Sequence, residues 1–138
     1  MRVMVIIKAN ADTEAGKLPS VEEFAEMGRF NEQLVKAGVM LVGDGLQPTA
    51  RGVRVRFGNG RGTVIDGPFT ESKELIAGFW LWQVRSMEEA VEWIRRSPFI
   101  KGTETVELRR LYDAEDFASM TPELKAQEAR LRSQIQKN

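Results

Sequence analysis

The chain contains no cysteine and no histidine among its 138 residues. Without cysteine it can form no disulfide, no thiolate nucleophile and no zinc site of the cysteine type. Without histidine it lacks the imidazole base, the usual protein ligand of haem and the Ser-His-Asp arrangement of hydrolases. Any catalytic chemistry must therefore use carboxylates, lysine, arginine or hydroxyl groups, and we expect a site without metal or cofactor.

The chain also has no excess charge of either sign and no long apolar run. It carries 20 Lys and Arg against 20 Asp and Glu, so its formal net charge is zero. This balance disfavours a nucleic-acid or anionic-membrane binder, which would need surplus positive charge. The apolar stretch from Met1 to Lys8 is too short for a signal peptide or a membrane span. We expect a single soluble domain in the cytoplasm.

Two stretches are apolar on both faces of an extended chain. In residues 75–84 one alternating set is Leu, Ala, Phe, Leu, Gln and the other is Ile, Gly, Trp, Trp, Val. In residues 2–8 the valines and Ile7 alternate with Met4 and Ile6. Aromatic and β-branched residues are typical of strands, and apolar residues on both sides indicate that both faces are covered.

A capping box predicts the first helix. Ser20 with Glu23 three residues later opens it, and Gly38 stops it after about Ala37. Asn31 is the only polar side chain on its predicted buried face, and it either bonds a neighbouring backbone group or lines a pocket as an amide. The residues of that face, at helical spacing, are Val21, Phe24, Met27, Gly28, Asn31, Leu34 and Val35.

The remaining segments follow from turn residues, alternation and a second capping box. In chain order they are a loop (10–18), a short strand (39–42), a bend (43–48), a hairpin (52–57 and 63–65 around the loop 58–62), a helix from Ser86 to about Arg96, a strand (103–112), a linker and a helix from about Thr121.

Four arginines and no acidic residue lie between residues 51 and 65. Two interpretations of this cluster stay open. It forms either a solvated strand face or an anion-binding patch that pairs with Asp66, Glu71 or the carboxylate of a ligand.

The order of these elements predicts an α+β, ferredoxin-like fold with an inserted β-hairpin and a C-terminal helix. Two helices cover only one face of its sheet, whereas the most apolar strands need cover on both. The simplest cover for the other face is the same sheet of a second copy, which gives a homodimer and a dimeric α+β barrel. Residues 1–112 would form the domain, and residues 113–138 a helical tail that is not a separate domain.

The turn Asp66-Gly67-Pro68-Phe69 leads into the apolar strand and is the candidate site. An acid at the entrance of such a strand is costly unless it is bonded or exposed. Asp66 is therefore either a functional carboxylate or a cap for backbone N–H groups around Phe69 or Thr70. The candidate catalytic residues are Asp66 and Glu71, and the candidate ligand-binding residues are Asp44, Arg54, Arg56, Phe69 and Lys73.

These residues closely resemble the DGPF-type proteins of the YCII-related family. The resemblance rests on Asp66-Gly67-Pro68-Phe69 with Glu71, Lys73 and Glu74, supported by residues 43–48 and 106–109, and covers about residues 1–112. It implies a dimeric α+β barrel of ferredoxin-like subunits, with a cleft near the Asp of the motif. In the YCII branch a His and an Asp are proposed as catalytic. Since this chain has no histidine, only Asp66 carries over as a candidate.

Two functions follow as hypotheses, and the sequence does not decide whether the chain is an enzyme. The first is a homodimer that binds a small molecule; as an enzyme it would be a metal-independent acid–base catalyst using Asp66 and Glu71, with Lys73 or an arginine stabilising charge. The second is a non-enzymatic regulatory module. Some proteins of this kind are attached to, or found beside, sigma-factor-like transcription regulators, which makes such a regulator a candidate partner. The biochemical role of the DGPF branch is unassigned.

Overall fold

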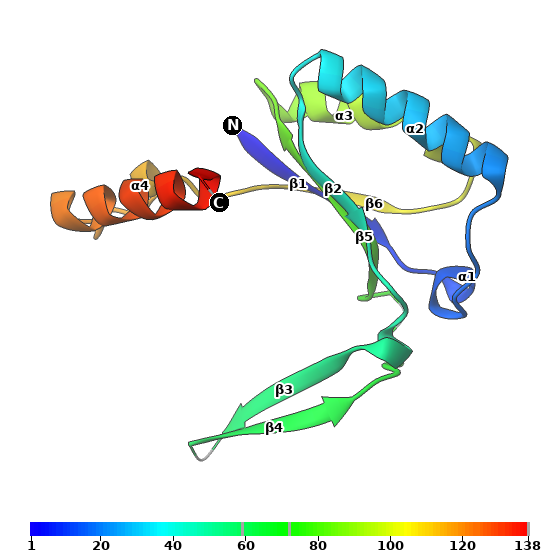
Figure 1. The fold of residues 1–138 in the computed structure, drawn as a ribbon, viewed down its shortest axis with the longest axis horizontal. Helices are drawn as coiled ribbons and strands as arrows, with labels where there is room; N and C mark the ends of the chain where they lie inside the picture. Colours follow the sequence, from blue (N-terminus) through cyan, green and yellow to red (C-terminus); the bar gives the residue numbers. More distant parts are fainter. Residues whose placement is uncertain (59, 72, 138) are drawn as a thin grey trace.

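The computed structural model describes residues 1–58, 60–71 and 73–137. Four antiparallel strands form its main sheet in the order β2-β5-β1-β6, and two helices, α2 and α3, cover one face (Figure 1). This is the predicted α+β, ferredoxin-like arrangement. The bounds are β1 (Arg2–Lys8), α2 (Val21–Lys36), β2 (Met40–Gly45), β5 (Ile76–Gln83), α3 (Met87–Arg95) and β6 (Val106–Arg110).

The core lies between β5 and the helices. Trp80 and Trp82 are both buried on the helix side of β5, where Phe30 of α2 meets their rings edge-on at centroid distances of 5.8 and 6.4 Å. Edge-to-face aromatic pairs add to the stability that burial of the rings supplies. Leu34 completes the contact from α2, and Ala90 contributes a fully buried residue from α3.

Both predicted capping boxes mark helix starts, but only the first is complete, since the Glu89 carboxylate accepts the N–H of Arg85 and not that of Ser86. The Ser20 hydroxyl accepts the N–H of Glu23 at 3.1 Å, and the Glu23 carboxylate accepts the N–H of Ser20 at 3.3 Å. At the start of α3 the Ser86 hydroxyl accepts the N–H of Glu89 at 3.1 Å. The backbone N–H and guanidinium of Arg85 both donate to the carboxylate of Glu89 and lower its pKa, although partial burial opposes this shift.

The predicted buried face of α2 is partly wrong. Val21, Phe24 and Val35 are exposed, whereas Phe30, which the prediction omitted, is buried. The helix packs on the two tryptophans of β5, so its buried face is centred on Phe30 and Leu34. Spacing alone favoured a neighbouring apolar stripe, because α2 carries apolar residues on more than one side.

Three element boundaries also differ from the predictions. The expected loop after β1 contains a short helix, α1 (Ala11–Glu14), which Asn10 caps. The glycines at 43 and 45 lie inside β2, and the irregularity occurs earlier, between Met40 and Val42. The last strand begins at Val106 and not at residue 103.

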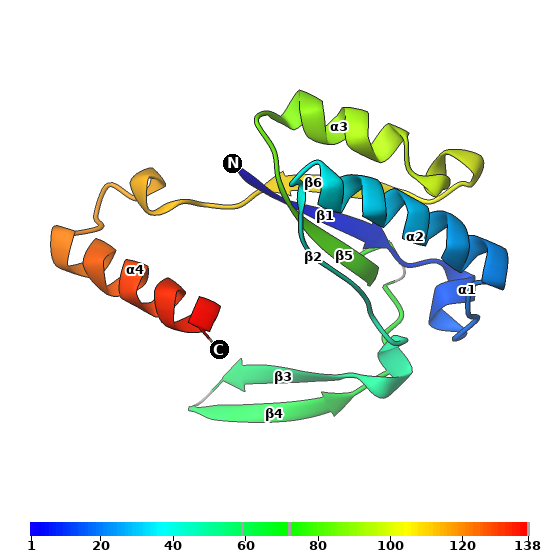
Figure 2. The ribbon, with the colours of Figure 1, turned by 45° about the horizontal axis from the view of Figure 1, so that its top comes forward.

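The other face of the sheet carries no helix. Met4 and Ile6 of β1 lie opposite Leu81 and Phe79 of β5 in the strand register. Because side chains alternate along a strand, these four apolar residues lie on the face opposite Trp80 and Trp82. Figure 2 shows α2 and α3 on the other side of the sheet. We call the surface that carries these four residues the open face. This agrees with the prediction that two helices cover only one face of the sheet.

The inserted hairpin is a separate two-stranded sheet of β3 (Val53–Gly58) and β4 (Arg61–Asp66). It projects away from the main sheet as an arm (Figure 1). A 3-10 turn at Thr49–Arg51 leads into it. The predicted hairpin loop includes Asn59, which lies outside the described residues.

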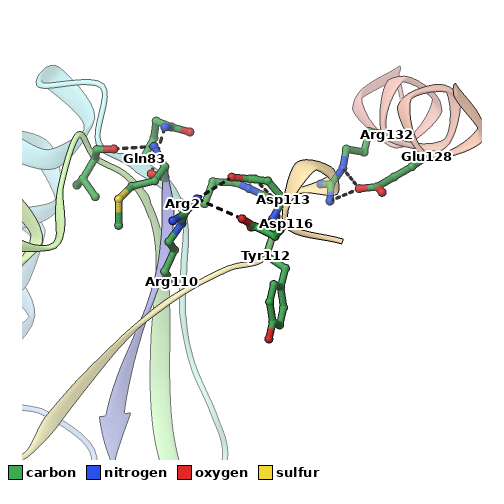
Figure 3. Close-up of polar contacts among 10 residues, drawn as sticks. Arg2, Gln83, Arg110, Tyr112, Asp113, Asp116, Glu128 and Arg132 are labelled. Carbon is green, nitrogen blue, oxygen red and sulfur yellow. Dashed lines mark hydrogen bonds and ion pairs between the residues drawn. The ribbon is translucent and has the colours of Figure 1, made fainter. Parts of the chain in front are cut away.

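The C-terminal helix α4 (Pro122–Lys137) starts near the predicted residue and stands away from the main sheet in Figure 1. Arg2 of β1 holds the segment that leads to it, donating to the carbonyl of Tyr112 at 3.2 Å and to Asp113 at 3.4 Å (Figure 3). That residues 1–112 fold without this tail stays a prediction. In the described part of the chain, no helix has the length and apolar character needed to cross a membrane.

Candidate functional site

Thr49 fixes the turn that contains the Asp66-Gly67-Pro68-Phe69 motif. Its hydroxyl accepts the N–H of Phe69 at 3.0 Å and donates to the Glu14 carboxylate at 2.5 Å. The second carboxylate oxygen of Glu14 accepts the backbone N–H of Thr49 at 3.1 Å. Three chain segments, α1, the 3-10 turn and the motif, are thereby joined. Sequence reasoning named neither Glu14 nor Thr49.

Gly67 is required by a close approach. A Cβ at this position would lie 1.7 Å from the carbonyl oxygen of Thr49, where no side chain fits. The Gly67 N–H donates to the carbonyl of Gly52 at 3.0 Å and closes the base of the arm. The motif glycine therefore brings the turn against the 3-10 turn, within reach of the Thr49 hydroxyl.

Asp66 is the last residue of β4, opposite Val53, and its side chain is exposed. In the structural alternative Asp66 caps backbone N–H groups around Phe69 or Thr70, but the N–H of Phe69 is bonded by Thr49. Among the hydrogen bonds and ion pairs between described residues, none involves the Asp66 carboxylate. Among the described residues, Thr49 and not Asp66 therefore caps the N–H of Phe69.

Three of the predicted site residues meet at the root of the arm. The Arg54 guanidinium lies 3.8 Å from the centre of the Phe69 ring and 3.5 Å from the Glu71 carboxylate. Stacking on an aromatic face and pairing with a carboxylate both suit the planar guanidinium. About half of each charged side chain is exposed, so the ion pair itself contributes little to stability. The Arg54 guanidinium thus contacts both Phe69 and Glu71.

The other predicted residues lie elsewhere. Arg56 is exposed further along β3. Lys73 borders a hollow beside Lys8, Glu14 and Thr105. Asp44 lies on β2 at the margin of a different hollow, described next.

That hollow lies between α2 and the ends of β2 and β5, and encloses about 250 Å³. Asn31 of α2 projects into its wall and accepts the indole N–H of Trp80 at 3.0 Å through its side-chain oxygen. Asn31 thus lines a pocket and is hydrogen-bonded, although to a side chain and not to the backbone. The lining residues are Ile7, Met27, Asn31, Gly43, Asp44, Gly45, Ala77, Gly78, Phe79, Trp80 and Phe99.

Two glycines allow the strands to form this wall. A Cβ on Gly43 would lie 2.5 Å from the Trp80 ring, and one on Gly78 would lie 3.1 Å from the backbone oxygen of Asp44. Phe99 meets Trp80 edge-on at 6.1 Å and forms the far side. The result is an apolar space with an amide on one wall, a usual composition for a small-molecule site. Asp44 pairs with Phe79 in the strand register, so its carboxylate lies on the same face as Phe79, away from α2.

Metal ligands are not gathered here. Across residues 1–58, 60–71 and 73–137, no group of three or more acidic, histidine or cysteine side chains is placed to hold a metal ion.

Comparison with known protein families shows to which family the chain belongs. The model of the YCII-related domain matches residues 1–115. The chain belongs to the YCII-related family. This match covers the sheet, both covering helices, the arm and the candidate site residues, and it confirms the resemblance inferred from the motif.

Known YCII-related and structurally similar proteins add little about chemistry. The chain is 33% identical over 70 residues to an uncharacterized protein, R00369, of Rhizobium meliloti (strain 1021), over 51% of this chain and 56% of that protein. The chain thus matches little more than half of that curated relative's length. A solved structure of 5-chloro-2-hydroxyhydroquinone dehydrochlorinase (TftG) from Burkholderia phenoliruptrix AC1100, in complex with 2,5-dihydroxybenzoquinone, is similar with 18% identity and a TM-score of 0.44. The alignment covers 83% of this chain and 98% of that one, and likeness at this level says nothing about the reaction of this chain.

Replacing Thr49 tests its role in fixing the motif turn. Thr49→Val removes the hydroxyl at nearly constant volume and leaves the Phe69 N–H without its acceptor. We expect the free energy of unfolding to fall by about 1–3 kcal/mol, the cost of an unpaired, partly buried polar group. Thr49→Ser keeps the hydroxyl and should lose clearly less. Urea unfolding curves measure both, and equal losses would show that the hydroxyl does not fix the turn.

Proposed function

We propose that this YCII-related protein binds a small organic molecule in the hollow between α2 and the sheet. The observation that carries the proposal is the hydrogen bond between Asn31 and Trp80 in the wall of that space. The hollow's volume of about 250 Å³ has room for a single substituted ring.

The bond to Trp80 fixes the orientation of the Asn31 amide. An indole N–H only donates, so the Asn31 atom that meets it is the oxygen, and the NH₂ group takes the other position. No described residue is bonded to that NH₂ group. It is therefore a donor available to a carbonyl, carboxylate or ring nitrogen of a ligand.

The remaining walls define the rest of the ligand. Trp80, Phe99, Met27 and Ile7 present apolar and aromatic surface, which favours a flat, apolar ring. We infer a ligand that is a small, apolar ring with a hydrogen-bond acceptor toward α2.

Asp66 does not line that hollow, so we propose it as an acid–base residue only for a compound that binds at the root of the arm. The Asp66 side chain is exposed, and Thr49 bonds the Phe69 N–H that Asp66 would cap in the structural alternative. Glu71 is a weaker candidate because it is paired with Arg54. That pairing leaves fewer unpaired carboxylates for acid–base chemistry at the turn, which favours the second candidate function, a ligand-binding module without turnover.

We further propose that the protein is a homodimer joined through the open face. Met4, Ile6, Phe79 and Leu81 form an apolar row there, while α2 and α3 occupy only the opposite side (Figure 2). A twofold axis would place the same row of a second copy against it, with the sheets about 10 Å apart. Trp82 is fully buried under its own helices, so Leu81 is the residue that faces the partner.

A charge on the open face tests the homodimer. Leu81→Glu should shift the sedimentation coefficient at micromolar concentration from that of a dimer to that of a monomer, because it leaves an unpaired charge in the interface. Gln33→Glu adds the same charge on the exposed side of α2 and should leave the dimer intact. A wild-type protein that sediments as a folded monomer would contradict the proposal.

Replacing the Asn31 amide tests the ligand site. Asn31→Asp keeps an oxygen for the Trp80 N–H but replaces the NH₂ donor with a second acceptor. We expect binding of monocyclic hydroxylated ketones, such as hydroxyacetophenones, to weaken by about tenfold or more, the value of one hydrogen bond with a buried polar group. Quenching of tryptophan fluorescence measures it, and urea unfolding checks the fold. Unchanged binding of a compound that quenches the wild type would exclude the hollow as its site.

Asp66→Asn separates a functional carboxylate from a structural one. The variant keeps size and most hydrogen bonding but removes the charge. A functional Asp66 predicts an unfolding free energy within about 0.5 kcal/mol of wild type, as at an exposed surface position, together with loss of turnover of any bound compound. A loss of about 1 kcal/mol or more, with turnover unchanged, would instead identify Asp66 as a cap.

A further inference from the structure

The arm has two unlike faces. Its register pairs Val53 with Asp66, Val55 with Val64 and Phe57 with Gly62, and it places the arginines on the opposite side. Phe57 and Val55 lie over Gly62, where a Cβ would be 3.0 Å from Val55 and 3.4 Å from Phe57. The residues of the apolar face are Val53, Val55, Phe57, Gly62 and Val64, with Asp66 at its root end, and those of the basic face are Arg54, Arg56, Arg61, Thr63 and Ile65.

The apolar face of the arm is uncovered. Phe57 is 81% exposed, Val64 62% and Val53 59%. A lone two-stranded hairpin is at best marginally stable in water, and a row of exposed large apolar side chains adds a further cost. An arm of this composition is stable only when another surface covers it.

The domain that carries the arm does not cover the arm's apolar face. The Gly67–Gly52 hydrogen bond closes the base of the arm, and Thr49 ties this base to Glu14 of α1. From that fixed root the arm extends away from the main sheet, on the side of the open face (Figures 1 and 2). It therefore reaches into the space where the proposed dimer places the second copy.

We propose that the apolar face of each arm packs on the body of a second copy of this chain, so that the dimer is held by two reciprocal arms. The inference rests on the proposed homodimer. The direction of the arm supports it, because the arm extends on the side of the open face, where the proposed homodimer places the second copy.

Two adjacent residues on opposite faces of β4 test the arm. Val64→Lys places a charge on the apolar face, whereas Thr63→Lys adds the same charge to the basic face. We expect Val64→Lys to raise the dimer dissociation constant by at least about tenfold and Thr63→Lys to change it by less than about threefold. Sedimentation equilibrium measures both constants, and circular dichroism checks that each variant folds.

Equal constants for the two variants, with the wild type a dimer, would overturn the arm contact and leave the homodimer standing. A wild-type monomer would overturn both proposals. A second measurement locates the contact: p-benzoylphenylalanine in place of Phe57 is photo-crosslinked in a mixture of unlabelled and ¹⁵N-labelled protein. Mixed-isotope crosslinked peptides support the contact between copies. Crosslinks only within one copy would show that the arm folds back on its own chain.

Discussion

Trp80 connects the sheet, the covering helix and the hollow. Its ring packs edge-on against Phe30, and its N–H donates to Asn31, so α2 is held to β5 by an apolar and a polar contact at once. Gly43 on the neighbouring strand leaves the room that this ring needs. The position of α2, the direction of the Asn31 amide and the shape of the space beside it all depend on this side chain.

The sequence predicted those parts of the fold whose signals are local. Alternating apolar residues located β1 and β5, and the serines at 20 and 86 located the starts of both covering helices. The buried face of α2 was harder to predict, because Phe24 and Phe30 are equally apolar and only the position of the tryptophans selects between them. The short helix α1 carries no apolar stripe, so its composition resembled that of a loop.

The site was less predictable for a physical reason. The motif identified the turn and brought Arg54, Phe69 and Glu71 to attention, and these three residues do meet. The residues that hold the turn, Glu14 and Thr49, are 35 positions apart and have no shared motif. Their partnership follows from how α1 and the 3-10 turn come together in space. Likewise, the spacing of Asn31 and Trp80 in the sequence did not indicate that the Asn31 amide would accept the Trp80 N–H.

The strand order has a consequence for synthesis on the ribosome. β1 is a central strand whose two neighbours, β5 and β6, are encoded at residues 76–83 and 106–110. The first seven residues of the sheet therefore leave the ribosome long before either neighbour exists. At roughly 5–20 residues per second, Val3, Val5 and Ile6 have no strand partner until β5 is made, an interval of about 4–15 s. Of the four strands of the main sheet, β1 is therefore made first and is the last to be paired on both sides.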